Sequence, residues 1–263
     1  MKPPALFSKN NYKESKKQSV MVVDDWVCKV ARSVKVEGRH KCSLPKKMSK
    51  ELAEEFGIHV EDGHMGHRIY NGCNTYEYTI SSGSDERKYL EKVVAPLIKK
   101  LYCIDLKVQI KQRNELRLSV KSKMLFNFKY GLGLPDGKKG NIGIPKIVLD
   151  SNFKTDFLRG LFDTDGCLQF KARKTVGPYP RIDIASKSKK MILQSNKILK
   201  NLGFSTCVGY SERKHYLTGT LCKCSRVYLY GHKNLNLWVD LIGFSNPKNI
   251  KKLKKYYSCL DKL

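Results

Sequence analysis

Two Asp-Gly dipeptides in this chain, Asp62-Gly63 and Asp165-Gly166, each end an apolar segment with helical periodicity. Glycine is common just after the last turn of a helix because it adopts a positive φ at little cost. Aspartate is less expected there, because the helix dipole is already negative at the C-terminus. One such dipeptide would indicate an ordinary turn, but two at corresponding places indicate a function. If the two helices pack in parallel, the carboxylates meet at two negative helix ends and need a cation between them.

The oxygen ligands of Asp62 and Asp165 suit a hard divalent cation, Mg²⁺ or Mn²⁺, which keeps several waters and takes further ligands from phosphate. A metal pair or cluster at this point could polarise a scissile phosphate, orient the attacking water and neutralise the leaving oxygen. The sequence therefore predicts metal-dependent phosphodiester hydrolysis.

Small residues on the two apolar segments predict a close helix contact. Gly160 and Thr164 are four residues apart and share one face of the second helix. In the first helix Gly57 is followed at the same spacing by Glu61, which is too large for such a contact. We expect Glu61 either to splay the helices or to turn outward into the metal or DNA site.

The chain after residue 48 consists of two copies of one order of elements, α-β-β-α-β-β-α. Asp62-Gly63 and Asp165-Gly166 are separated by 103 residues, and a segment with five glycines, 131–144, joins the copies. We expect a basic N-terminal extension at 1–48, a first repeat with its linker at 49–144 and a second repeat at 145–263. The fold class predicted is α+β, with antiparallel sheets that form a DNA-binding saddle.

The predicted strands alternate between apolar and polar residues, so one face of each sheet packs under helices and the other is rich in Arg, Lys, Gln and Tyr. Two-stranded ribbons with such side chains fit the major groove of duplex DNA. An ordinary solvated sheet face is the alternative, but the net charge of +27 and the repetition in both halves favour a polyanionic partner. The residues predicted to contact DNA are Arg68, Thr79, Lys107, Gln109, Arg117, Lys171, Arg173, Arg181, Asp183, Arg226 and Tyr228.

The composition excludes several other classes of protein. No apolar run is long enough to span a membrane, and the N-terminus lacks the apolar core of a signal peptide. Nine cysteines are an odd number in a chain too large to need a disulfide scaffold, so we expect a reduced, intracellular and DNA-associated protein. Prokaryotic cytoplasm and an organelle are equally compatible with these features. Ribosomal association and binding to a membrane surface are weaker explanations of the basic charge.

Residues Leu158–Gly166, with the sequence Leu-Arg-Gly-Leu-Phe-Asp-Thr-Asp-Gly, resemble the signature of the LAGLIDADG homing endonucleases, and Glu55–Gly63 is a looser copy. The resemblance extends over residues 49–263 and is to the monomeric members with two motifs. It implies that Asp62 and Asp165 bind the catalytic metals at the interface of the halves, helped by the backbone carbonyls of Glu61 and Thr164. It also implies that basic or amide strand side chains surround the metals. By position these are Lys107 or Gln109 in the first half and Arg213 or Lys214 in the second.

We therefore expect an intron-encoded, site-specific endonuclease that cuts both strands of a long asymmetric duplex as a monomer acting as a pseudo-dimer. The alternative is a cleavage-deficient relative that binds DNA as a regulator or intron RNA as a maturase. Retention of Asp62 and Asp165 favours the enzyme, whereas the charged Glu55 and Glu61 in the first motif favour divergence.

Overall fold

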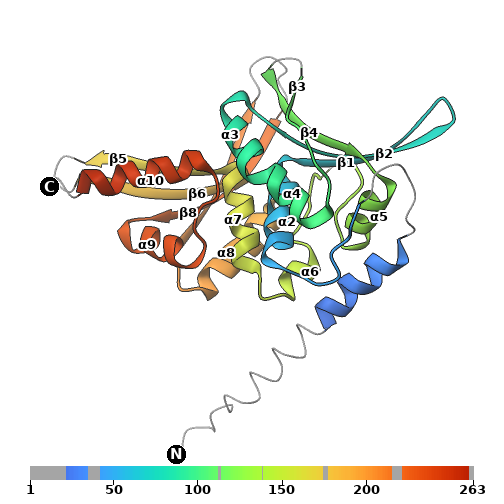
Figure 1. Cartoon of the computed structure of the whole chain (residues 1–263). Helices are drawn as coiled ribbons and strands as arrows, with labels where there is room; N and C mark the ends of the chain where they lie inside the picture. Colours follow the sequence, from blue (N-terminus) through green and yellow to red (C-terminus); the bar gives the residue numbers. More distant parts are fainter. Residues whose placement is uncertain are drawn as a thin grey trace, which may run out of the picture.

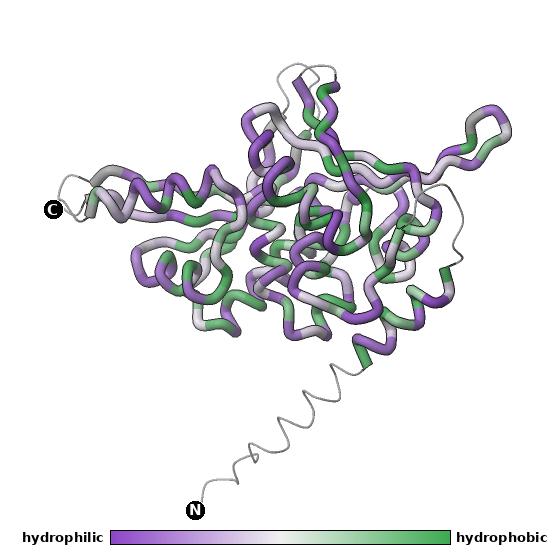
Figure 2. Tube along the Cα trace, in the orientation of Figure 1, coloured by the Kyte–Doolittle hydropathy of each residue, from purple (hydrophilic) through white to green (hydrophobic). Residues whose placement is uncertain are grey.

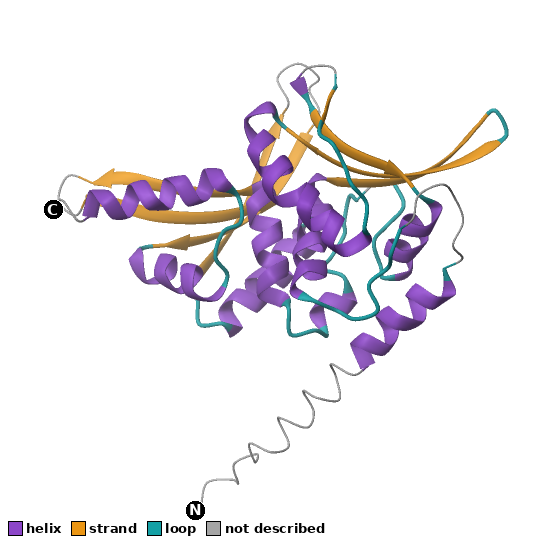
Figure 3. Ribbon diagram, viewed as in Figure 1, coloured by secondary structure: helices purple, strands orange, loops and turns teal. Residues whose placement is uncertain are grey.

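The computed structural model describes residues 22–34, 42–111, 114–137, 139–173, 177–214 and 221–260. It contains two four-stranded antiparallel sheets, with the strand orders β1-β2-β4-β3 and β5-β6-β8-β7 (Figure 1). The helices lie against one face of each sheet (Figure 3). The α+β class and the two pseudo-symmetric repeats predicted from the sequence are confirmed.

The first repeat begins with a helix and continues with two hairpins separated by a helical segment. Its elements are α2 (Lys50–Asp62), β1 (Gly63–Tyr70), β2 (Cys73–Ser82), the 3-10 turn η1 (Ser84–Glu86), α3 (Arg87–Tyr89), the π-helical η2 (Leu90–Val94), α4 (Ala95–Tyr102), β3 (Gln109–Ile110), β4 (Leu116–Lys121) and α5 (Lys123–Gly131). Residues 104–110 alternate between apolar and polar side chains, but of these only Gln109 and Ile110 pair with β4. Cys103 ends α4 in the left-handed conformation, and the chain up to residue 108 forms no ladder.

The second repeat has the same order, with longer strands and one more helix. Its elements are α7 (Lys154–Asp165), β5 (Gly166–Arg173), β6 (Gly177–Ser186), α8 (Lys189–Asn201), β7 (Thr206–Lys214), β8 (Leu221–Tyr230), α9 (His232–Leu241) and α10 (Pro247–Leu260), with the short α6 (Lys146–Leu149) before them. The rings of Phe170 and Tyr256 stack with centroids 4.3 Å apart, which holds α10 along β5. Along these elements hydrophilic and hydrophobic residues alternate over short distances (Figure 2).

The two sheets have equivalent registers. Ile80 lies between Gly63 on β1 and Leu118 on β4, and Ile184 lies in the same way between Gly166 and Val227. The aliphatic side chains of both rows are buried under the helices. Because strand residues alternate between faces, the next residues along β2, β4, β6 and β8 point away from the helices. Each repeat therefore presents an outward sheet face at the same distance from its first helix.

Glu55, which the sequence suggested as a sign of divergence, is instead a fully buried structural residue. Its carboxylate accepts hydrogen bonds from the hydroxyls of Tyr78 and Tyr102 and forms an ion pair with Lys129. The Lys129 ammonium also lies 4.7 Å from the centroid of the Tyr78 ring. This satisfied buried network joins α2, β2, α4 and α5, because a buried charge is tolerated only with a partner.

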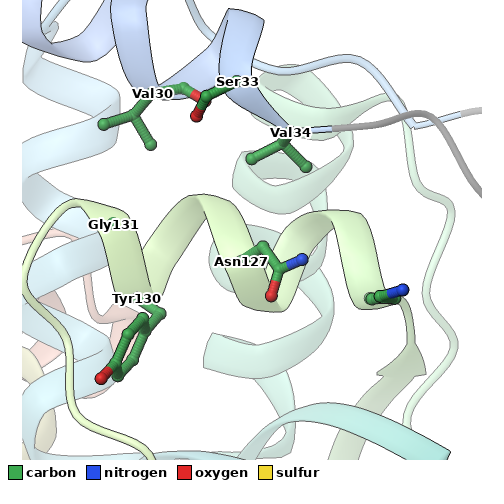
Figure 4. A pocket seen from close by; sticks show the side chains of 7 residues that line it. Val30, Ser33, Val34, Asn127, Tyr130 and Gly131 are labelled. Atoms are coloured by element: carbon green, nitrogen blue, oxygen red, sulfur yellow. The ribbon is translucent and has the colours of Figure 1, made fainter.

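The described part of the N-terminal extension packs on the first repeat. Residues 22–33 are helical and bury Val23 and Val27. The Asp24 carboxylate accepts a hydrogen bond of 2.9 Å from the backbone N–H of Met48. Figure 4 shows Val30 and Val34 facing α5 across a small pocket. No helix among the described residues is long and apolar enough to cross a membrane.

Candidate metal centre and DNA-binding surface

Helices α2 and α7 pack against each other at the centre of the molecule, and two glycines make this possible (Figure 1). A Cβ atom on Gly57 would lie 2.2 Å from the carbonyl oxygen of Phe157. One on Gly160 would lie 2.1 Å from the carbonyl oxygen of Glu54. The backbones are thus in direct contact, and the helices run in parallel toward Asp62 and Asp165.

Gly63 and Gly166 are required for a reason other than the one predicted from the sequence. Neither has a positive φ: Gly63 has φ −83° and Gly166 has φ −87°, both extended. A Cβ atom would instead lie 2.2 Å from His59 Nδ1 in the first repeat and 2.2 Å from Phe162 Cδ2 in the second. Glycine therefore lets the chain turn from helix into strand directly over an aromatic ring.

The carboxylates at the two helix ends lie close enough to oppose each other's ionisation. Burial and the neighbouring Asp165 raise the pKa of Asp62 to about 7. The same two causes, burial first, raise the pKa of Glu61 to about 8. A divalent cation would relieve this repulsion, so the donor set fits a hard metal ion.

The helices do not splay at Glu61, and its carboxylate lies in the site, which is one of the two positions expected for it. It lies beside Asp165 of the other helix and Ser186 of β6. Its Oε1 atom is buried without a hydrogen-bond partner among the described residues. The site therefore holds three carboxylates, those of Glu61, Asp62 and Asp165. No group of three or more His, Cys, Asp and Glu side chains in the described ranges is arranged as a complete metal site.

Lys139 is a residue of the site that the sequence did not reveal. Its ammonium donates hydrogen bonds to the carbonyl oxygens of His59 at 3.0 Å and Glu61 at 2.7 Å. Burial lowers the pKa of Lys139, while Glu61, Asp62 and Asp165 oppose that shift. Lys139 comes from the Gly-rich segment that we interpreted as a linker, and nothing in its spacing marks it.

The carbonyls implied as metal ligands differ between the repeats. The Glu61 carbonyl accepts from Lys139, so an ammonium already occupies one side of it. Thr164 lies at the corresponding place on α7, and its hydroxyl donates to the carbonyls of Gly160 and Leu161. Asn246, a neutral residue, donates to the carbonyl of Asp163 at 3.0 Å. A backbone carbonyl at the end of α2 thus accepts a hydrogen bond from an ammonium, and one at the end of α7 accepts a hydrogen bond from an amide.

The four residues expected around the metals lie at separate places along the two repeats, and their role stays a prediction. Lys107 lies in the segment without strand structure, and Gln109 is exposed on the outer strand of the first sheet. Arg213 and Lys214 pair with Cys222 and Leu221 at the far end of the β7–β8 hairpin. Arg213 and Lys214 lie four and five residues beyond Gly209 on β7, which is roughly 13–17 Å along the strand. Their side chains lie outside the described part of the structure.

Most of the predicted DNA-contacting residues alternate with buried residues and lie on the outward sheet faces. These are Arg68, Arg117, Lys171, Arg181, Arg226 and Tyr228; the side chain of Arg173, at the end of β5, lies outside the described residues. Thr79 and Asp183 also lie on this face, but they are only 4% and 2% exposed. Little of either side chain is therefore open to a ligand, and their contact with DNA stays a prediction. Asp183 accepts from Arg181 and Arg226.

Several known proteins are similar to this chain. Residues 152–243 match the model of the LAGLIDADG-like domain. A variant of I-DmoI, solved with its nicked target DNA in the presence of manganese, matches with a TM-score of 0.50 at 19% identity. That match covers 74% of this chain and 96% of the other. The LAGLIDADG homing endonuclease I-GzeII, solved with its DNA target, matches with a TM-score of 0.50 at 10% identity, over 81% of this chain and 89% of the other.

A curated protein also matches: the replication factor C small subunit of Methanocaldococcus jannaschii is 27% identical over 210 residues. The match covers 78% of this chain, but the chain spans only 10% of the length of that protein.

The fold and the site together define a protein of two fused repeats whose first helices pack in parallel and end in carboxylates. Residues 152–243, in the second repeat, match a LAGLIDADG-like domain, and the fold of the chain is similar to that of these solved homing endonucleases.

Proposed function

We propose that this protein is a site-specific DNA endonuclease that hydrolyses both strands of a long asymmetric duplex with a divalent metal, Mg²⁺ or Mn²⁺. The observation that carries the proposal is the meeting of Asp62 and Asp165 at the ends of two helices in backbone contact. We also propose that one chain acts alone as a pseudo-dimer, because it supplies both aspartates. The chain would then consist of an N-terminal extension at 1–48, a first repeat with its linker at 49–144 and a second repeat at 145–263.

The residues of this chain would bind and orient the duplex. The outward faces of the two sheets carry arginine and lysine side chains that neutralise phosphates and fix the register of the DNA. Asp62 and Asp165 would hold the divalent metal, with water and phosphate oxygens completing its shell. That metal would supply Lewis-acid activation of the scissile phosphate and a lowered pKa of the attacking water.

Lys139 would stabilise charge at the same place. Its ammonium is half-buried beside three carboxylates and lies on the carbonyl that precedes Asp62. A buried ammonium next to a phosphate is a strong donor toward a developing negative charge, because little water screens it. We infer that Lys139 orients the end of α2 before DNA binds and contacts the phosphate afterwards.

The decisive experiment uses a duplex library with a randomised central region. The protein is incubated with the library and Mg²⁺, and the cut ends are sequenced. We expect one long site to be cut on both strands by the wild-type protein, and no cutting by Asp62→Asn or Asp165→Asn. Both variants should still bind the selected site, since the fold does not need these charges. Cleavage at near-wild-type rates by either variant would refute a metal site shared by the two aspartates.

A second candidate function is sequence-specific DNA binding without cleavage. The buried carboxyl of Glu61 favours it, because its pKa, raised to about 8, keeps a proton in the site that a bound metal would have to displace. In the same experiment this function would appear as an enriched bound site that remains intact across a Mg²⁺ and Mn²⁺ series. A maturase would instead retain a structured intron RNA in preference to every duplex.

A further inference from the structure

Two arginines occupy the same place in the two repeats. Arg117 on β4 pairs with Ser81, and Arg226 on β8 pairs with Ala185. Arg117 precedes Leu118, which lies in the same row across the sheet as Gly63. Arg226 precedes Val227, which lies in the same row as Gly166. Because the two registers coincide, the arginines lie at equal distances from the centre along their sheets.

Both arginines lie beside the metal centre and point away from the helices. Ser186, which lies beside the Glu61 carboxylate, is the neighbour of the residue opposite Arg226. Arg117 alternates with buried leucines, and Arg226 is the neighbour of the buried Val227. The side chains of Arg117 and Arg226 are 33% and 39% exposed, which is enough to reach a ligand on the outward face.

Each arginine is held in place by a carboxylate, although the two carboxylates come from different positions. Glu115 Oε1 accepts from Arg117 Nε at 3.1 Å and from Nη2 at 2.9 Å. Asp183 Oδ2 accepts from Arg226 Nη1 at 3.4 Å, and its other oxygen accepts from Arg181. A guanidinium has five N–H donors, so these contacts leave several for another partner. The contacts also reduce the conformational entropy that each arginine would lose on binding.

Asp183 is the best evidence that this arrangement serves positioning. A carboxylate on the outward face of a sheet would normally be solvated, but this one is 2% exposed. It is enclosed by Arg181, Arg226 and the ring of Tyr228, whose centroid lies 5.7 Å from the Arg181 guanidinium carbon. Burying a charge costs free energy unless it is paired, so the arginines are fixed relative to the sheet.

We propose that Arg117 and Arg226 each read one guanine, at mirror-related positions on either side of the centre of the target. Arginine recognises guanine through paired hydrogen bonds to O6 and N7 in the major groove. The target should therefore contain an inverted pair of G·C base pairs closest to its centre. This proposal depends on the proposed binding of duplex DNA, but not on cleavage.

The sequence outside that pair should differ between the half-sites. Arg181 and Asp183 of β6 correspond to Glu77 and Thr79 of β2 when Ile184 is superimposed on Ile80. An acidic and a cationic side chain at one register favour different bases. The two arginines are thus a symmetric element within an asymmetric recognition surface.

The test measures binding in the absence of divalent metal, so that catalysis does not enter. The wild-type protein, Arg117→Ala and Arg226→Ala each select duplexes from a randomised library, with Lys171→Ala as an exposed basic control farther along β5. We expect the wild-type site to hold the inverted G·C pair, Arg117→Ala to lose it in one half and Arg226→Ala in the other. Lys171→Ala should weaken all duplexes and leave the selected pair unchanged.

A second measurement needs no variant of the protein. Replacing one central guanine by 7-deazaguanine removes N7 without changing base pairing. The Kd of the wild-type protein should rise about 10-fold to 100-fold. Arg226→Ala should be insensitive to the replacement in one half only. Asp183→Asn, checked for folding by circular dichroism, should reduce discrimination in that same half.

Two outcomes would overturn the inference while leaving DNA binding intact. One is an enriched site without the inverted pair, or an unchanged Kd with 7-deazaguanine. The other is a uniform loss of affinity in the arginine variants, which would make these residues phosphate contacts. If the wild-type protein enriches no duplex at all, the proposed function fails and the inference fails with it.

Discussion

Replacing Gly160 by alanine tests whether the contact between α2 and α7 positions the two aspartates. The new Cβ atom would lie 2.1 Å from the carbonyl oxygen of Glu54 and 3.0 Å from the backbone nitrogen of Ile58. Both neighbours are backbone atoms of a helix and cannot rotate away. The helices must therefore move apart by about 1 Å to reach an ordinary contact distance.

The expected loss of stability follows from two opposing effects. Overpacking a well-packed interface costs about 1–3 kcal/mol. Alanine is also a better helix former than glycine by about 1 kcal/mol, which offsets part of that cost. Because the clash is with backbone, we expect a net loss of about 1–2 kcal/mol for Gly160→Ala. Gly57→Ala should lose a similar amount, since its Cβ atom would lie 2.2 Å from the carbonyl oxygen of Phe157.

The effect on the metal centre should exceed the effect on stability. A displacement of about 1 Å between groups that must act together costs about 100-fold in rate. The assay is urea denaturation together with single-turnover cleavage of the selected duplex. Gly140→Ala is the control, because no atom lies within 4 Å of the added carbon. An unchanged urea midpoint for Gly160→Ala, or cleavage equal to that of Gly140→Ala, would refute the packing argument.

Four further predictions concern charge. Lys139→Met should reduce the rate of single-turnover cleavage about 100-fold while the Kd for DNA changes less than threefold. Equal cleavage rates for Lys139→Met and the wild-type protein would show that the ammonium is only structural. Glu61→Gln should lower the Mg²⁺ concentration needed for half-maximal cleavage, and an unchanged or higher requirement would make the Glu61 carboxylate a ligand. Since the pKa values of Asp62 and Glu61 are raised to about 7 and about 8, the folded protein binds more protons than the unfolded chain between about pH 4 and 8. The free energy of unfolding should then fall by about 3–6 kcal/mol from pH 5 to 8 in urea titrations, and Asp62→Asn should flatten that slope. Finally, the logarithm of the association constant for the selected duplex should fall linearly with the logarithm of the salt concentration, with a slope of about −0.9 per neutralised phosphate and at least about six phosphate contacts. A flat salt titration would exclude the sheets as the binding surface.

The repeat and its helix ends were predictable because they depend on local patterns. Helical periodicity stops at Asp62-Gly63 and at Asp165-Gly166, and the strands that follow alternate with a period of two. The apolar residues around His59 likewise indicate a packed position, and His59 is buried with its ring 5.2 Å from that of Tyr78.

The contacts that complete the site were not predictable, because they join residues far apart in the sequence. Lys139 reaches His59 across 80 residues, and Lys129 reaches Glu55 across 74. From sequence alone a lysine in a Gly-rich segment is a solvated residue, and a glutamate in an apolar helix is a misfit. Only the packing of α5 and the linker against α2 supplies their partners.

The distribution of charge around the centre argues for a cation more strongly than the aspartates do alone. The chain carries 51 basic and 24 acidic residues, and its outward sheet faces attract a polyanion. The point at which the two sheets meet differs from those faces, because the carboxyl groups of Glu61, Asp62 and Asp165 crowd around one ammonium, and the raised pKa values of Glu61 and Asp62 show that ionisation of all three is disfavoured without a cation. A DNA phosphate drawn onto the sheets would add a further negative charge at close range, where little water screens the repulsion. A divalent cation is what makes the two surfaces compatible, and it does so at the phosphate that lies over the ends of both helices.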